Sequence, residues 1–372
     1  MRILQVVTSL GIGGAEQVAF SIAKKLARQH ASTVFAVMAT PAEYATLRSA
    51  HLRQLDHCGV DWHECSAKSS SEALWRSSLT LARKIRTWQP DVVHSHTDIP
   101  DACTSIARRL QRFRIVRTIH NTKLWPTRPS IGRLTESGFV NDTIVAIGPD
   151  SRRAYLELRE RSQMPPSAHL SIVENGIDLS ISGRDTRENL RRELNCRPEK
   201  FQLGFVGRLT EQKGIDVLLK AIHILPPAER TRVELHVIGD GDLRSATQAF
   251  IDDTGLPVRL HGAKPEAKRY FSAFDLAVVP SRYEGAPLAA LEVLASGTRG
   301  LFTDAPGLRD VLPPDCAPLA KAGDAASLAA ELARCIQGGT HPHVPIADEW
   351  LQRFSADRMA ADYERIYVDA LR

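Results

Sequence analysis

Short runs of apolar residues alternate along the chain with longer stretches in which apolar positions recur at helical spacing. In the first half, the apolar runs predict strands at 2–8, 33–38, 91–95, 114–119 and 143–147, and a helix is expected over 15–29. The pattern restarts after a polar stretch, with strands predicted at 201–206, 233–238, 258–260, 275–279 and 300–303 and a helix over 214–225. Strand, loop and helix in this order predict parallel sheets with crossover helices.

This pattern predicts an α/β chain made of two doubly wound domains of similar size. We expect an N-terminal domain over 1–180, a linker over 181–200 and a second domain over 201–354. Residues 355–372 predict an amphipathic helix for which Ser355 is the N-cap. Because open α/β sheets bind ligands at the carboxyl ends of their strands, we expect the two domains to face a cleft lined by those loops.

The composition is that of a globular, water-soluble chain. Of the 372 residues 43% are apolar and 24% are charged, which excludes a disordered, a collagen-like or a small disulfide-stabilised protein. No stretch approaches the roughly 18 uncharged apolar residues of a membrane span, so a polytopic membrane protein is excluded. The apolar start, 1–7, leads directly into a glycine loop and is interpreted as a strand, not as a signal peptide. Six cysteines without a CxxC pair favour a reduced, cytoplasmic compartment.

Positive charge is concentrated in the first half of the chain. Residues 1–185 contain 24 basic and 17 acidic residues, a balance of +7, whereas the remainder contains 24 and 26, a balance of −2. This asymmetry suits an anionic substrate or peripheral contact with an anionic membrane, and no nucleic-acid-binding motif supports a nucleic acid partner. A basic run is either a solvated helix face or a membrane-surface patch; it consists of Arg108, Arg109, Arg112, Arg114 and Arg117.

A glycine loop, Gly11 to Gly14, follows the first predicted strand and opens a helix. Glycine lets a ligand approach the backbone closely, and free amides at a helix N-terminus attract phosphate, although a tight turn without a ligand fits equally well. The spacing GxGG differs from the dinucleotide pattern GxGxxG, and residues 39–41 supply no acid for a ribose hydroxyl. These two features argue against a nicotinamide-dependent oxidoreductase.

Two cations occupy the loop that follows the strand at 201–206. Arg208 and Lys213 are expected at the carboxyl edge of the second sheet, where a helix begins. Two cations together with helix amides can neutralise a diphosphate without a metal ion. The alternative is a pair of solvated loop charges.

Two glutamates lie close together in the sequence after the strand at 275–279. Glu284 precedes a predicted helix and Glu292 lies inside it, while Pro287 suits the first helical turn. A carboxylate accepts two hydrogen bonds and therefore matches the vicinal hydroxyls of a ribose or a hexose. Gly285 and Ala286 offer backbone amides beside them. For Glu292 alone, an exposed helix charge is the ordinary interpretation.

Taken together, these motifs resemble retaining glycosyltransferases of the GT-B fold in glycosyltransferase family 4, which includes bacterial mannosyltransferases and lipopolysaccharide or capsule glycosyltransferases. The resemblance covers nearly the whole chain and rests on the 11–16 glycine motif, Asn175 to Asp178, the 207–214 loop, Pro280-Ser281 and the glutamate pair of the 284–292 segment. The last helix, with Phe354, Tyr363 and Tyr367, is of the type that crosses back to the N-terminal domain in that fold.

The resemblance implies roles for individual residues. Arg208 and Lys213 would hold the donor diphosphate and act in catalysis, and Glu284 would act at the hexose. Glu292 would take the ribose hydroxyls. The other substrate-binding positions implied are Gly13, Gly14, His120, Gly262, Gly285, Ala286, Pro287 and Leu288, with His120 near the reacting sugar. The segment 298–310 departs from the family pattern, because it lacks the usual GxPV proline and the double glycine that follows it.

The resemblance therefore implies an enzyme that moves a hexose-type sugar from a nucleoside-diphosphate sugar to an acceptor hydroxyl with retention, without a metal or other cofactor. The expected acceptor is lipid-linked or of the lipopolysaccharide type, which would place the protein in the cytoplasm or on the inner face of the membrane. A sugar-nucleotide epimerase on the same fold and a non-enzymatic nucleotide-sugar-binding protein are the alternatives. The nucleotide base is left open among uracil, guanine and adenine.

Two further groupings mimic metal sites. His94 and His96 lie on one strand near His120, but substrate contact for one and packing for the others are the favoured interpretations. Asp240-Gly241-Asp242 has the DxD spacing of metal-dependent glycosyltransferases, yet it follows a strand and is interpreted as a turn.

Overall fold

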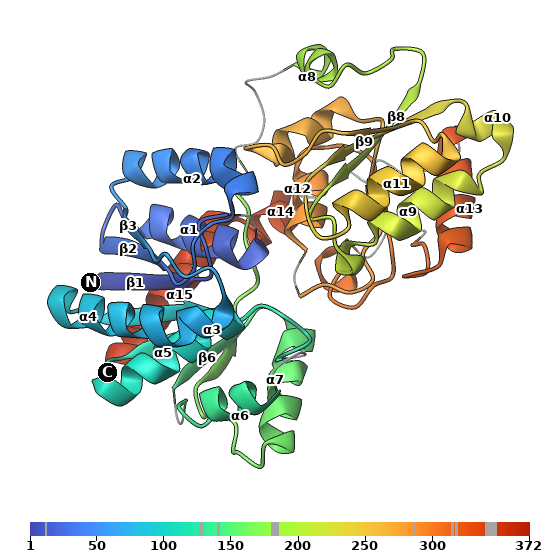
Figure 1. Ribbon diagram of the computed structural model, residues 1–372. Helices are drawn as coiled ribbons and strands as arrows, with labels where there is room; N and C mark the ends of the chain where they lie inside the picture. Colours follow the sequence, from blue (N-terminus) through green and yellow to red (C-terminus); the bar gives the residue numbers. More distant parts are fainter. Residues whose placement is uncertain are drawn as a thin grey trace. The chain divides into compact units, whose positions relative to one another are not determined.

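The computed structural model describes residues 1–11, 13–125, 129–139, 142–179, 186–285, 287–313, 316, 319–338 and 348–372. The chain divides into two compact units (Figure 1). Unit 1 contains Met1–Gly176 together with Phe354–Arg372, and unit 2 contains Ile177–Arg353. Unit 2 is therefore one continuous stretch of chain, whereas unit 1 is assembled from both ends of it.

The described part of unit 1 contains a parallel seven-stranded sheet in the order β3-β2-β1-β4-β5-β6-β7. Its strands are β1 Arg2–Val7, β2 Ala31–Ala36, β3 Asp61–Glu64, β4 Val92–His96, β5 Ile115–Ile119, β6 Thr143–Ala146 and β7 Leu170–Ile172. The pattern of apolar residues did not predict β3 and β7, the two edge strands. Both are short, and neither is fully buried, so neither carries a continuous apolar run.

Helices cover both faces of this sheet. They are α1 Gly14–Leu26, α2 Ala45–His57, α3 Ser70–Glu72, α4 Ser78–Trp88, α5 Asp98–Leu110, α6 Pro129–Glu136, α7 Pro149–Arg161 and α15 Ala356–Leu371, with the turns η1 Ala42–Tyr44 and η2 Ala73–Ser77. Side chains of a strand alternate between its faces, so Leu4 and Val6 of β1 pack toward α4 and α5. Val7 packs toward α1 and α2 on the other face. No helix within the described ranges is long and apolar enough to cross a membrane.

The C-terminal helix α15 belongs to unit 1, where it lies beside α1 (Figure 1). It begins after Ser355, whose hydroxyl accepts a hydrogen bond from the backbone N–H of Arg358 at 3.2 Å, which confirms the predicted N-cap. Tyr363 and Tyr367 of α15 are fully buried against the sheet. The last residues of the chain thus complete the core that the first residues begin.

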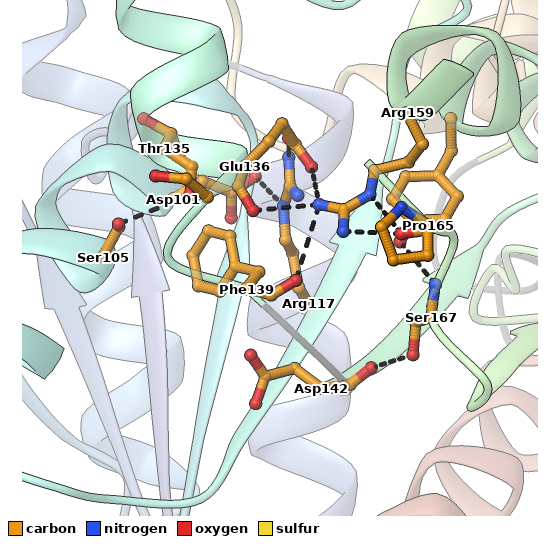
Figure 2. A network of polar contacts seen from close by, with 12 residues as sticks. Asp101, Ser105, Arg117, Thr135, Glu136, Phe139, Asp142, Arg159, Pro165 and Ser167 are labelled. Carbon is orange, nitrogen blue, oxygen red and sulfur yellow. Dashed lines mark hydrogen bonds and ion pairs between the residues drawn. The ribbon is translucent and has the colours of Figure 1, made fainter. Parts of the chain in front are cut away.

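A buried cluster of charges ties three helices of unit 1 to β5 (Figure 2). Nε of Arg117 lies 2.5 Å from Asp101 Oδ2 of α5, and its Nη2 lies 2.6 Å from Glu136 Oε1 of α6. The other oxygen of Glu136 faces Arg159 of α7 at 3.5 Å. Charges persist in a protein interior only when they are paired, so these four side chains hold one another in place. The placement of Arg117 in an exposed basic run was therefore wrong, because this guanidinium is fully buried.

The described part of unit 2 contains a parallel five-stranded sheet in the order β10-β9-β8-β11-β12. Its strands are β8 Phe201–Val206, β9 Val233–Ile238, β10 Val258–Leu260, β11 Leu276–Val279 and β12 Gly300–Phe302. The helices are α8 Arg187–Glu193, α9 Ile215–His223, α10 Pro227–Arg230, α11 Arg244–Thr254, α12 Leu288–Ala295, α13 Ala325–Ile336 and α14 Asp348–Arg353, with the 3₁₀ turns η3 Glu211–Lys213, η4 Ala267–Ala273 and η5 Arg309–Val311.

The segment 181–200, which the sequence predicted as a linker, contains the helix α8 instead. Residues 180–185 lie outside the described residues, but α8 is part of unit 2. Leu190 and Leu194 are buried, and Arg191 pairs with Asp275 at 2.8 Å. Because the residues around these two leucines are mostly charged, the sequence shows no clear apolar face for α8, although this face packs against unit 2.

Candidate functional site

The centre of the candidate site is an ion pair at the carboxyl edge of the unit 2 sheet. Lys213 ends η3 after β8, and Glu284 follows β11; Nζ of the lysine lies 2.6 and 2.8 Å from the two carboxylate oxygens. Ser281 donates a hydrogen bond to Oε1 of Glu284 at 2.6 Å. Glu284 is buried, so the cation and the hydroxyl replace the water that its charge has lost. The structure thus brings together two predicted site residues that lie 71 positions apart.

The backbone of Glu284 is held by the loop after β12. Its N–H donates to the carbonyl oxygen of Pro306 at 2.9 Å. Gly307 has a φ of +78°, and a Cβ atom on it would lie 2.2 Å from the carbonyl oxygen of Glu284. The segment that departs from the family pattern, 298–310, therefore supports the candidate site directly.

Close packing of two loops positions Lys213. Gly214 has a φ of +69°, and a Cβ atom there would lie 2.0 Å from the carbonyl oxygen of Pro280. Only glycine allows both the backbone conformation and this approach. Arg282 adds a second clamp, because its Nη1 and Nη2 each lie 2.7 Å from a carboxylate oxygen of Asp216 in α9.

Arg208 is arranged differently from Lys213. It lies in the same loop, but its side chain is exposed, and its guanidinium has no hydrogen-bond or ion-pair partner among the residues that the structure describes. Its charge is therefore available to a ligand without breaking an internal contact.

Glu292 lies in the second turn of α12 and has unused hydrogen-bonding capacity. Its side chain is partly exposed and makes no hydrogen bond within the described chain. Loss of solvent around the carboxyl raises its pKa to about 7, although the charges of Lys268 and Lys213 act in the opposite direction. A carboxyl group in this state changes charge near neutral pH.

The remaining predicted positions of unit 2 surround these residues in the sequence. Gly285 and Leu288 are partly exposed, whereas Ala286 lies outside the described residues. Pro287 is buried and is the N-cap of α12, one position before the predicted first turn. Gly262 follows β10 with a φ of +69°, and its carbonyl oxygen accepts a hydrogen bond from Gly239 at 2.9 Å.

The predicted positions of unit 1 lie at the carboxyl ends of β1 and β5. Gly13 is the N-cap of α1 and Gly14 is its first residue. Glu16 folds back over this loop, since a Cβ atom on Gly13 would lie 1.8 Å from Glu16 Oε2. His120 follows β5 directly and is buried, and this burial lowers its pKa to about 3. The imidazole of His120 is therefore uncharged at neutral pH.

One further histidine and a glutamine accompany His120. Nε2 of His120 lies 2.9 Å from Nδ1 of His96, and Nε2 of His96 lies 2.7 Å from Oε1 of Gln5 in β1. Gln5 was not among the predicted site residues, although an uncharged polar residue among the apolar residues of the first strand was a usable signal.

Neither grouping that mimics a metal site is arranged as one. Within the described ranges, no three or more histidine, cysteine or acidic side chains are arranged to hold a metal ion. Asp240 instead accepts a hydrogen bond from the backbone N–H of Gly241 at 2.8 Å and pairs with Arg244 at 3.2 Å. Independence from metal ions stays a prediction.

Comparison with known protein families identifies both units. The model of Glycosyltransferase Family 4 matches residues 12–181, and the model of Glycosyl transferases group 1 matches residues 186–347. The chain belongs to the family 4 glycosyltransferases. The predicted family is thereby confirmed.

Individual relatives of this glycosyltransferase are distant. It is 23% identical over 385 residues to the O-antigen biosynthesis glycosyltransferase WclY of Escherichia coli, covering 100% of this chain and 99% of WclY. It is 27% identical over 247 residues to the uncharacterized glycosyltransferase MJ1607 of Methanocaldococcus jannaschii, covering 60% of each chain.

The fold is shared with solved glycosyltransferases. Anabaena Alr3699/HepE, whose structure was solved in complex with UDP and glucose, superimposes with a TM-score of 0.82 at 18% identity, over 99% of this chain and 100% of HepE. The likeness confirms the predicted GT-B fold with two Rossmann-like α/β units.

Gly307 provides a test of how the site is supported. Gly307→Ala should lower the free energy of unfolding by about 3 kcal/mol or more, because a strained backbone is combined with a clash against Glu284. Gly255→Ala is the matched control: its φ is +63°, but nothing lies within 4 Å of the added Cβ, so a loss of about 1 kcal/mol is expected. Urea unfolding measures both, and equal losses would show that Gly307 does not support the Glu284 loop.

Proposed function

We propose that this glycosyltransferase transfers a hexose from a UDP-sugar to a hydroxyl of a lipid-linked or lipopolysaccharide-type acceptor, with retention and without a metal ion, during synthesis of a cell-surface polysaccharide. The observation that carries the proposal is the Lys213–Glu284 pair beside Glu292 at the carboxyl edge of unit 2. Two comparisons support it: HepE was solved with UDP-glucose, and WclY is named for O-antigen biosynthesis.

In this proposal the donor binds to unit 2. In the structure, Lys213 neutralises Glu284. A bound diphosphate brings its own negative charge to the lysine. A hexose brings hydroxyl groups that can donate hydrogen bonds to the carboxylate of Glu284. Arg208 supplies the second cation for the diphosphate, because its side chain has no partner to give up in the described chain.

The cations act mainly in the transition state. As the glycosidic bond breaks, negative charge grows on the departing UDP and the sugar becomes oxocarbenium-like. Arg208 and Lys213 therefore stabilise the transition state more than the ground state. The acceptor oxygen attacks from the face that UDP leaves, its proton passes to the departing phosphate, and the anomeric configuration is retained.

The acceptor side of the proposal includes contact with an anionic membrane. Arg109, Arg112 and Arg114 of the predicted basic run are exposed in unit 1, whereas Arg108 is bound to Asp142. On η2 and α4, which pack against α5, Trp75 is 65% exposed and Leu79 is 42% exposed. An exposed indole and exposed basic side chains on neighbouring elements of one unit suit the headgroup region of a bilayer.

Co-sedimentation with vesicles tests the membrane contact. The protein should bind phosphatidylglycerol vesicles but not phosphatidylcholine vesicles. The triple change Arg109→Ala, Arg112→Ala and Arg114→Ala should weaken binding by about 100-fold, since each basic residue contributes about 1 kcal/mol near an anionic surface. The charge-matched control, Arg152→Ala, Arg153→Ala and Arg161→Ala on α7, should keep the affinity. Equal binding to both lipids would remove this part of the proposal.

The two cations of unit 2 test the diphosphate assignment. Arg208→Ala and Lys213→Ala should each lower kcat by about 100-fold, in line with the loss of one charge-stabilising group. UDP release from UDP-glucose measures the rate, after a thermal-shift panel of UDP-, GDP- and ADP-sugars has tested the choice of donor.

Stability separates the two variants. Arg208→Ala should leave the unfolding free energy within about 0.5 kcal/mol of the native value because Arg208 is exposed, whereas Lys213→Ala leaves Glu284 buried without its cation and should be destabilising. Lys220→Ala, at an exposed position of α9, is the control for loss of one positive charge. Near-native turnover in both site variants would refute the assignment.

Glu292 makes donor binding depend on pH. Its pKa of about 7 in the free protein means that the acceptor form, the carboxylate, predominates only above that pH. Affinity for UDP-glucose should therefore rise by about 10-fold between about pH 6 and pH 8, as the ionised fraction grows. UDP-glucose is used because its diphosphate diester does not titrate in this range. In calorimetry, Glu292→Gln should remove the pH dependence, and a variant that kept the native slope would exclude the ribose role.

A further inference from the structure

A chain of hydrogen bonds runs through the interior of unit 1 and ends at His120. Gln5 of β1 donates from Nε2 to the hydroxyl of Tyr367 in α15 at 3.1 Å, and its Oε1 lies 2.7 Å from Nε2 of His96. Nδ1 of His96 in turn lies 2.9 Å from Nε2 of His120. All of these side chains are buried. We call Gln5, His96 and His120 the unit 1 relay.

The contacts of the relay determine where its protons lie. A carbonyl oxygen only accepts, so Nε2 of His96 must carry the hydrogen that points to Gln5. In a neutral ring the other nitrogen is then an acceptor, and Nδ1 of His96 receives the hydrogen of His120 Nε2. His120 is thereby left with an unprotonated Nδ1, which accepts no hydrogen bond from any residue that the structure describes.

The buried surroundings of His94, His96 and His120 keep all three imidazole rings uncharged. Histidines face it from β4 and from the loop after β5, where His94 and His120 lie, and Tyr367 with Tyr363 faces the cluster from α15. Burial lowers the pKa of His96 well below its usual value, and the two neighbouring histidines lower it further. No carboxylate or cation among the described residues counteracts this effect on His96.

Unit 2 contains the same three residue types in the same order. Gln202 of β8 donates to the carbonyl oxygens of Arg197 and Lys200, so only its Oε1 is left for Nε2 of His236, 2.8 Å away. Nδ1 of His236 lies 2.9 Å from Nε2 of His261, which follows β10 as His120 follows β5. Two backbone carbonyls therefore fix the orientation of the Gln202 amide, so Nε2 of His236 must carry the hydrogen that points to its Oε1. This is the proton position deduced for His96 in unit 1.

Building on the proposed function, we propose that Gln5 and His96 are positioning residues of the transfer reaction: they hold His120 in its neutral Nε2–H form and so make its Nδ1 the hydrogen-bond acceptor for a sugar hydroxyl. The relay also gives a reason for two buried polar side chains in strands of unit 1, those of Gln5 in β1 and His96 in β4. Each transmits to His120 a choice of tautomer that starts at the carbonyl oxygen of Gln5.

Nuclear magnetic resonance of the ligand-free protein tests the relay without any substrate. In full-length protein labelled with ¹⁵N-histidine, two-bond correlations should show His120 as the Nε2–H tautomer, with no titration between about pH 5 and pH 8. A Nδ1–H tautomer, or a ring that titrates in this range, would overturn the proposal. This result does not depend on the donor or on catalysis, so it stands apart from the outcome for the proposed function.

The variant Gln5→Glu tests whether the tautomer matters for the reaction. A carboxylate at this position raises the pKa of His96. Below that pKa His96 is a cation that donates from both nitrogens, which forces His120 to accept with Nε2 and to carry its hydrogen on Nδ1. Turnover of UDP-glucose should then fall by about 10- to 100-fold in kcat, with little change in KM, and should recover as the pH rises through the pKa of His96.

Tyr367→Phe is the matched control. It removes the hydroxyl that Gln5 Nε2 contacts but leaves Gln5, His96 and His120 in place, so it should keep the shape of the native pH profile even if the protein is less stable. If Gln5→Glu does not fold, His96→Phe replaces it and should lower kcat at every pH. If Gln5→Glu folds and keeps the pH profile of the unchanged protein, Gln5 has no positioning role. If the unchanged protein turns over no nucleotide sugar, that result counts against the proposed function alone.

Discussion

A polar side chain that leaves water inside a parallel sheet has to find a partner, and this constraint shapes both units. In unit 1 it produces the pairing of Arg117 with Asp101 and Glu136 on one face of β5, and the hydrogen bonds of Gln5 and His96 on the side of α15. In unit 2 it produces the contact of Lys213 with Glu284. The partners come from loops and helices far apart in sequence, so satisfying the buried groups also fixes the loops at the carboxyl ends of the strands.

The order of strands and helices was largely predictable because apolar runs report burial. Both sheets, the restart of the pattern at Phe201 and the N-cap at Ser355 follow from that signal. The signal fails where burial is incomplete: β3 and β7 are edge strands with exposed positions, and α8 with its C-cap contributes only Leu190 and Leu194 among many charges.

The candidate site was predictable as a set of residue types but not as an arrangement. Motifs selected Lys213, Glu284 and Glu292, whose chemistry suits a diphosphate and sugar hydroxyls. They could not show that the first two contact each other, because that contact depends on the close approach of Gly214 to Pro280 and of Gly307 to Glu284. Gln5 was missed for a similar reason: its meaning comes from the side chains across the sheet, which no spacing along one strand reveals.

The position of α15 has a consequence for the order in which the protein is made. A ribosome completes the continuous residues of unit 2 before it adds Tyr363 and Tyr367. Until Tyr367 is added, Gln5 of β1 and His94 of β4 therefore lack the hydroxyl that both contact in the folded protein. Unit 2 can therefore fold on the nascent chain at a stage when unit 1, most of which precedes it in the sequence, still lacks part of its native interior.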